Sequence, residues 1–112
     1  MLLAANRDER LDRPWNAPAA HWPGLIGGRD AMAGGTWMAM NRAGVVAAVL
    51  NRPGSLGPEA GKRSRGELPL LALEAASAAG AAARLAALDA GLWRPFHAVL
   101  ADAEGAWFVL GA

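Results

Sequence analysis

Residues 34–54 (GGTWMAMNRAGVVAAVLNRPG) constrain the fold more than any other stretch, because they contain the clearest hairpin in the chain. Residues 36–40 alternate in size and are β-prone, and residues 45–50 form an apolar run short enough for a buried strand. Residues 41–44 join them and end in glycine, which suits a type I turn closed by a left-handed residue. We therefore predict two antiparallel strands, with Asn51 at the end of the second.

Two helices are expected after this hairpin. Ser64 followed by Glu67 is a capping-box pattern, which predicts a helix over residues 65–76 and explains Glu67 as the carboxylate that reaches back to the cap. Ser77 can cap a second helix over residues 78–90. Both helices carry apolar residues at helical spacing and should pack on one face of a sheet.

The remaining segments predict shorter elements. Residues 96–110 indicate a second hairpin around a four-residue connection, residues 102–105, whose acidic side chains are turn residues rather than a catalytic pair. Residues 25–28 are typical of a short strand, and residues 2–5 of the last half of one. Residues 13–24 hold three prolines and no usable periodicity, so we expect an irregular loop. The fold class is therefore α+β, with two antiparallel hairpins and helices on one face.

Length, composition and charge exclude several classes of protein. The 112 residues suit a single domain, and 54% apolar content suffices for a core. The chain has no cysteine, which excludes disulfides and thiolate metal sites and makes the cytoplasm the default location. A net charge of +1 gives no electrostatic case for nucleic acid. No apolar run approaches the roughly 20 residues of a transmembrane helix.

Three tetrapeptide motifs and one strand occur in an order that resembles a known family. Asn6-Arg7-Asp8-Glu9 comes first, then Gly34-Gly35-Thr36-Trp37, then the strand ended by Asn51, and finally Arg65-Gly66-Glu67-Leu68. In this order the motifs are similar to those of the NRDE family, which includes the transport and Golgi organisation 2 proteins. The resemblance implies a partial αββα sandwich like that of N-terminal-nucleophile hydrolases. It also implies that residues 1–112 form a single, incomplete domain that lacks the family's upstream Met-Cys strand and its C-terminal part.

The resemblance also assigns candidate site residues. In an N-terminal-nucleophile hydrolase the first side chain attacks an amide while nearby groups position the amine and stabilise the oxyanion. Asp8 and Asn51 match those two supporting catalytic roles, although this chain contains no cysteine and Met1 cannot replace it as the nucleophile. We expect Asn6, Asp8 and Asn51 to converge. The expected binding residues are Asn6, Arg7, Trp37, Arg52 and Arg65.

Three functions remain open from the sequence. The first is an NRDE-family protein of unassigned activity, and the second is an amide or ester hydrolase in an N-terminally extended form. The third, which the resemblance implies, is a protein that handles haem or a lipid or acyl ligand; a cleft framed by Trp15, Trp22 and Trp37 would suit such an apolar ligand. His21 and His97 are interpreted as packing or solvated residues. We expect no cofactor and no metal, and a small-molecule ligand or substrate as the partner.

Overall fold

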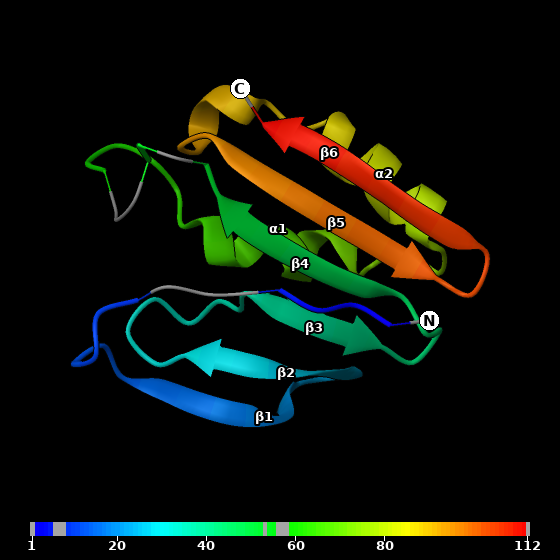
Figure 1. The fold of residues 1–112 in the computed structure, drawn as a ribbon, viewed down its shortest axis with the longest axis horizontal. Coiled ribbons are helices and arrows are strands. Elements are labelled where there is room, and N and C mark those ends of the chain that lie inside the picture. Colours follow the sequence, from blue (N-terminus) through cyan, green and yellow to red (C-terminus); the bar gives the residue numbers. More distant parts are fainter. Residues whose placement is uncertain (1, 6–8, 53, 56–58, 112) are drawn as a thin grey trace.

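Six antiparallel strands form one sheet whose spatial order follows the chain. The computed structural model describes residues 2–5, 9–52, 54–55 and 59–111. Figure 1 shows each strand beside the next along the chain, and the helical elements lie between β4 and β5 in the sequence. The α+β fold class is confirmed. The strands are β1 (Trp15–Trp22), β2 (Leu25–Asp30), β3 (Met38–Asn41), β4 (Val46–Asn51), β5 (Phe96–Asp102) and β6 (Gly105–Gly111).

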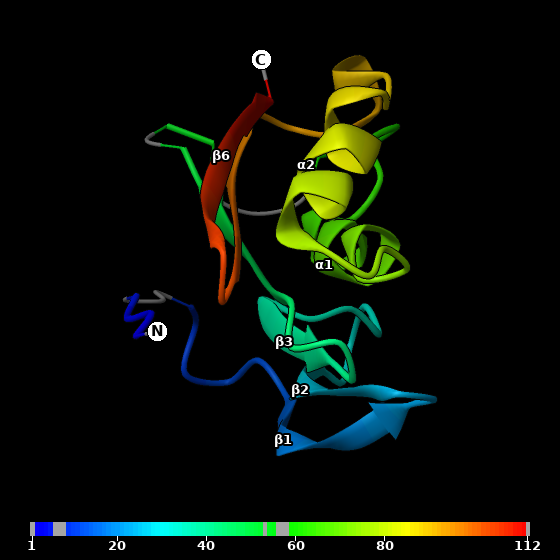
Figure 2. The same cartoon turned by 90° about the vertical axis from the view of Figure 1, so that its right-hand side faces the viewer.

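The helices lie together on one face of the sheet, as predicted. Figure 2 shows α1 and α2 on the same side of β6. Among the described residues, no helix has the length and apolar character needed to span a membrane. The helical elements are the 3-10 turn η1 (Arg65–Glu67), α1 (Leu68–Ala72), α2 (Ala78–Ala86) and the 3-10 turn η2 (Ala90–Leu92).

The hairpin of β3 and β4 is confirmed, and its turn chemistry is the expected one. Gly44 adopts a φ of +84°, a left-handed conformation that glycine tolerates best. The side chain of Asn41 closes the turn, because its Oδ1 accepts hydrogen bonds from the backbone N–H groups of Ala43 and Val45, both at 3.0 Å. Its Nδ2 donates to the carbonyls at the end of the α1 segment, which ties the hairpin to the helical layer. Asn51 is the last residue of β4.

Alternation along the strands separates a buried face from an open one. On β5, Phe96 and Leu100 are buried and belong to one core cluster with Leu68 of α1. On β6, Phe108 and Leu110 remain 72% and 70% exposed. Because successive strand residues point to opposite faces, Trp107 and Val109 of β6 pack against the core, whereas Phe108 and Leu110 lie on the other face.

The irregular loop expected over residues 13–24 is wrong, because most of it forms β1. This strand pairs with β2 between Trp15 and Asp30 and again between Trp22 and Leu25, with register shifts between these points. Nearly all its residues are exposed, so no apolar alternation marked it in the sequence. A proline is also tolerated in a strand that, like β1, lies at the edge of a sheet.

Element ends differ from the predictions at four places. Residues 2–5 form no strand. The helix expected over residues 65–76 is a 3-10 turn followed by five α-helical residues, and the helix expected over 78–90 stops at Ala86. The second hairpin has a two-residue loop, since Asp102 and Gly105 already pair. Local propensity located these elements, whereas tertiary contacts set their ends.

Glu67 also differs from the prediction, which had it reach back to the helix cap. Ser64 accepts a hydrogen bond from the Gly66 N–H, as a cap should. The Glu67 carboxylate instead accepts from the Trp93 indole at 3.0 Å and pairs with Arg63 at 2.5 Å. Glu67 therefore links α1 to the segment that precedes β5.

Candidate functional site

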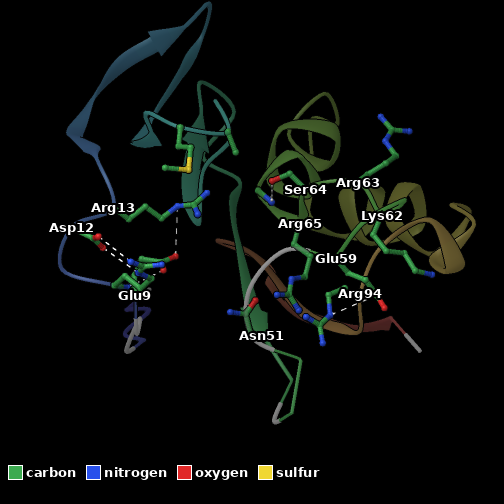
Figure 3. Close-up of a pocket in the computed structure, with 14 residues that line it drawn as sticks. Glu9, Asp12, Arg13, Asn51, Glu59, Lys62, Arg63, Ser64, Arg65 and Arg94 are labelled. Atoms are coloured by element: carbon green, nitrogen blue, oxygen red, sulfur yellow. Dashed lines mark hydrogen bonds and ion pairs between the residues drawn. The ribbon is translucent and has the colours of Figure 1, made fainter.

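An open cleft lies where β4 ends, with a volume of about 950 Å³. One wall comes from residues 9–13, and the other comes mainly from residues 59–66 (Figure 3). The lining carries three carboxylates, from Glu9, Asp12 and Glu59. It carries six cationic side chains, those of Arg10, Arg13, Lys62, Arg63, Arg65 and Arg94.

Asn51 lies in this cleft because β4 ends there. Its backbone pairs with Phe96 of β5, and its exposed side chain lines the cleft. In the part of the chain that the structure describes, no other group forms a hydrogen bond with this side chain. The Asn51 amide is therefore placed to donate to, or accept from, a bound molecule.

Arg65 lines the same cleft as Asn51, and two of its hydrogen bonds go to neutral oxygen atoms. Its Nη1 donates to Ser55 Oγ at 3.1 Å and to the Pro95 carbonyl at 2.9 Å. Ser55 in turn donates to the Arg52 carbonyl at 2.6 Å. These bonds fix the guanidinium at the end of the sheet.

The electrostatic environment of Arg65 disfavours its charge. Burial lowers the pKa of Arg65, and the nearby positive charge of Arg94 lowers it further. Arg94 forms an ion pair with Glu59 in which Nε and Oε2 are 3.9 Å apart. Two guanidinium groups thus lie near each other on the same wall of the cleft (Figure 3).

The opposite wall is stabilised by its own ion pairs. Arg13 donates to Asp30 through Nε and Nη2, and the shorter of the two distances is 2.6 Å. Partial burial would raise the pKa of Asp30, but hydrogen bonds from Arg13 and from the N–H groups of Met32 and Ala33 outweigh it and lower that pKa. The hydrogen bond with Asp30 correspondingly raises the pKa of Arg13. These charges therefore have structural partners.

Two glycines of the sequence motifs meet beside the cleft. A Cβ added to Gly35 would lie 2.5 Å from the carbonyl carbon of Gly66, so the two backbones leave no room for a side chain. The Thr36 N–H donates to the Gly66 carbonyl at 2.9 Å. The close neighbour of Gly35 is therefore the backbone of the Arg65–Leu68 motif.

The predicted site residues divide into three groups. Asn51 and Arg65 line one cleft. Trp37 and Arg52 do not belong to the described lining of that cleft. Asn6, Arg7 and Asp8 lie outside the described residues, and their roles stay predictions. Glu9, the last residue of their motif, does line the cleft.

The three tryptophans do not frame a common space. Trp37 packs its ring against Gly28 and meets Trp15 edge to face, with centroids 6.4 Å apart. Trp22 lies at the other end of β1, where its ring is 5.7 Å from that of His21. Aromatic packing on the hairpins therefore accounts for their positions.

Sequence reasoning missed Arg94 and Ser55. Arg94 stands two residues before Phe96, the partner of Asn51 across β4 and β5. Pairing of the two predicted hairpins would have brought it to the end of β4, but the sequence does not state which strands pair. Among the described residues, no group of three or more His, Cys, Asp or Glu side chains could hold a metal ion.

Comparison with known proteins agrees with the motif order. No curated protein matches the chain. The family model of Transport and Golgi organisation 2 matches residues 1–110, a span that contains all three tetrapeptide motifs and every described residue that lines the cleft. The chain belongs to the Transport and Golgi organisation 2 family.

Proposed function

We propose that this protein binds a small molecule in the cleft at the end of β4, with Asn51 and Arg65 in contact with it. The main evidence for this proposal is that these two polar side chains, which come from separate segments, line one cleft of about 950 Å³. That volume is within the range of small-molecule sites, which are usually a few hundred to about 1,000 Å³. Glu9 lines the same cleft and is the last residue of the Asn6-Arg7-Asp8-Glu9 motif, which supports a role for this motif in binding.

The chemistry of the cleft favours a polar ligand over an apolar one. Most of the described residues that line the cleft carry charged side chains. Met32 is the largest apolar residue among them. Trp15 and Trp37 contact each other rather than this space. An apolar ligand such as a lipid would displace water from these charged groups without hydrogen-bonding to them, so the haem or lipid class receives less support.

Substitution of Asn51 tests the proposal. Ligands found by thermal-shift screening of a metabolite collection should stabilise the protein, and Asn51→Ala should weaken their binding by about 10-fold, the usual effect of one or two lost hydrogen bonds. Asn16→Ala is the matched control, because Asn16 bonds Arg29 on β1 and β2 away from the cleft. Ligands that bind both variants equally would refute this site.

A second candidate is amide or ester hydrolysis in a form whose first residue is cysteine. This candidate is supported by the lining of the cleft, which contains both Asn51 and Glu9, the residue that follows Asp8 in the sequence. In that form Asp8 would position the amine and Asn51 would stabilise the oxyanion. Asn51→Ala should then lower the rate of cleavage by about 10² to 10³. A form with N-terminal cysteine that cleaves no amide or ester would exclude this candidate.

A further inference from the structure

We propose that the open face of the sheet, the one that carries Phe108 and Leu110, packs against the same face of a second copy of this chain. This interface is independent of the cleft at the end of β4 and goes beyond the binding function proposed for that cleft. The evidence comes from the residues that share the open face, from its exposed area and from the arrangement of the described chain around it.

Strand pairing shows which residues share the open face. Met38 pairs with Ala48, and Ala48 pairs with Val99. Val99 in turn pairs with Phe108, so one row of side chains crosses the sheet from β3 to β6. Paired residues of neighbouring strands lie on the same face. The rows on either side contain Ile26, Met40, Val46, Ala101 and Ala106, and Leu50, His97 and Leu110.

The open face lacks the polar residues that a solvated sheet face normally carries. Antiparallel sheets with one face in water alternate apolar and polar residues along each strand. Here the rows that cross the sheet are apolar apart from His97, and they contain no charged side chain. Strands that are apolar on both faces are typical of sheets that are buried on both faces. The sequence of β4, β5 and β6 therefore predicts a second layer on this face.

Large apolar side chains are exposed in two strips of the open face. Phe108 and Leu110 form the strip on β6, and Ile26, Met38 and Met40, which are between 36% and 54% exposed, form the strip on β2 and β3. At roughly 200 Å² for each fully exposed large side chain, the strips expose on the order of 500 Å². The half-exposed residues beside them bring this area towards the roughly 800 Å² that each partner buries in a standard interface.

A second copy fits the arrangement of these strips. Ala48 and Val99, which lie between them, are small and buried. A two-fold axis along the strands, between β4 and β5, would place the β6 strip of one copy over the β2 and β3 strip of the other. Two sheets packed in this way lie about 10 Å apart with their side chains interdigitated. Because both surfaces are uncharged, no ionised group would lose its water.

The described chain does not supply a second layer of its own. Among the described residues, no helix or strand lies on the side of β6 opposite to α2 (Figure 2). Leu2, in the segment before β1, is 94% exposed and so is not seated on the sheet. At most three consecutive residues of the 112 lie outside the described part, fewer than the roughly five to six of a typical strand. The layer that covers this face therefore comes from outside these 112 residues.

Sedimentation equilibrium of the 112-residue protein at several concentrations tests this inference. We expect a dimer that dissociates on dilution. Phe108→Lys should raise the dissociation constant of the dimer by about 100-fold or more, because a symmetric interface loses this contact twice and gains two buried charges. The site is exposed in one copy, so the circular dichroism spectrum should not change. A protein that is monomeric at every concentration would overturn the inference.

The matched control is Leu11→Lys. Leu11 is a fully exposed apolar residue before β1, outside the strands of the open face, so this variant should dimerise as the unaltered protein does. Equal dissociation constants for Phe108→Lys and Leu11→Lys would show that the open face is not the interface.

Thiol labelling locates the interface by a second route. The chain contains no cysteine, so Leu110→Cys introduces a single thiol on the β6 strip and Leu11→Cys introduces one outside the open face. The maleimide reaction of Leu110→Cys should slow as the protein concentration rises, because the dimer covers this position, whereas that of Leu11→Cys should not. A dimer in which Leu110→Cys reacts as fast as in the monomer would contradict packing through this face.

Discussion

Gly35→Ala is expected to destabilise the protein by about 3 kcal/mol, the upper part of the usual range for overpacking. The added methyl would lie 2.5 Å from the Gly66 carbonyl carbon and 2.6 Å from its oxygen, and both are backbone atoms that cannot rotate away. The Thr36 hydrogen bond to Gly66 would also be strained. Urea denaturation measured by tryptophan fluorescence would give the change in free energy of unfolding.

Two further glycines calibrate this prediction. A Cβ on Gly105 would lie 3.4 Å from the Trp107 ring, an ordinary contact, so Gly105→Ala should change stability by less than about 1 kcal/mol. A Cβ on Gly66 would lie 3.3 Å from Gly35, so Gly66→Ala should fall between the other two. Equal stability of the Gly35 and Gly105 variants would contradict the close packing of the two motifs.

Asn41→Ala should cost about 4 kcal/mol, because one half-buried side chain forms four hydrogen bonds at about 1 kcal/mol each. Its Nδ2 donates to the carbonyls of Leu73 at 3.0 Å and Ala75 at 2.8 Å, and its Oδ1 accepts from Ala43 and Val45. Removing it leaves these backbone groups without their partner. Thermal unfolding and the same urea titration would measure the loss.

The matched control for Asn41 is Asn16→Ala. Asn16 accepts one hydrogen bond, from Arg29 at 3.0 Å, so its loss should cost about 1 kcal/mol or less. Amide hydrogen exchange adds a local test, since the N–H of Val45 should exchange faster in Asn41→Ala than in Asn16→Ala. A variant of Asn41 no less stable than that of Asn16 would show that the turn does not depend on this side chain.

Local chemistry made the central hairpin predictable. The left-handed conformation of Gly44 and the position of Asn51 at a strand end follow from a four-residue turn between two β-prone runs. Ser77 accepts from the Gly80 N–H, as its cap pattern predicted. Each of these features is decided within a few residues, which is the range over which sequence patterns are informative.

Features that depend on distant contacts were not predictable in the same way. β1 carries no apolar alternation because it is an exposed edge strand whose register shifts at two places. Glu67 follows a capping pattern, yet its carboxylate bonds Trp93, 26 residues away. Arg94 joins Asn51 only because β4 pairs with β5. Asn51 and Arg65 of the candidate site could therefore be predicted from the sequence. Arg94 could not, because its position depends on the pairing of β4 with β5.

A crystal structure of the protein with the tightest-binding molecule from the ligand screen would test the central claim most directly. We predict that the molecule lies in the cleft at the end of β4, in hydrogen-bond contact with the Asn51 amide and the Arg65 guanidinium. A ligand seated against Trp15 and Trp37 instead, with Asn51 and Arg65 free of contact, would contradict the account.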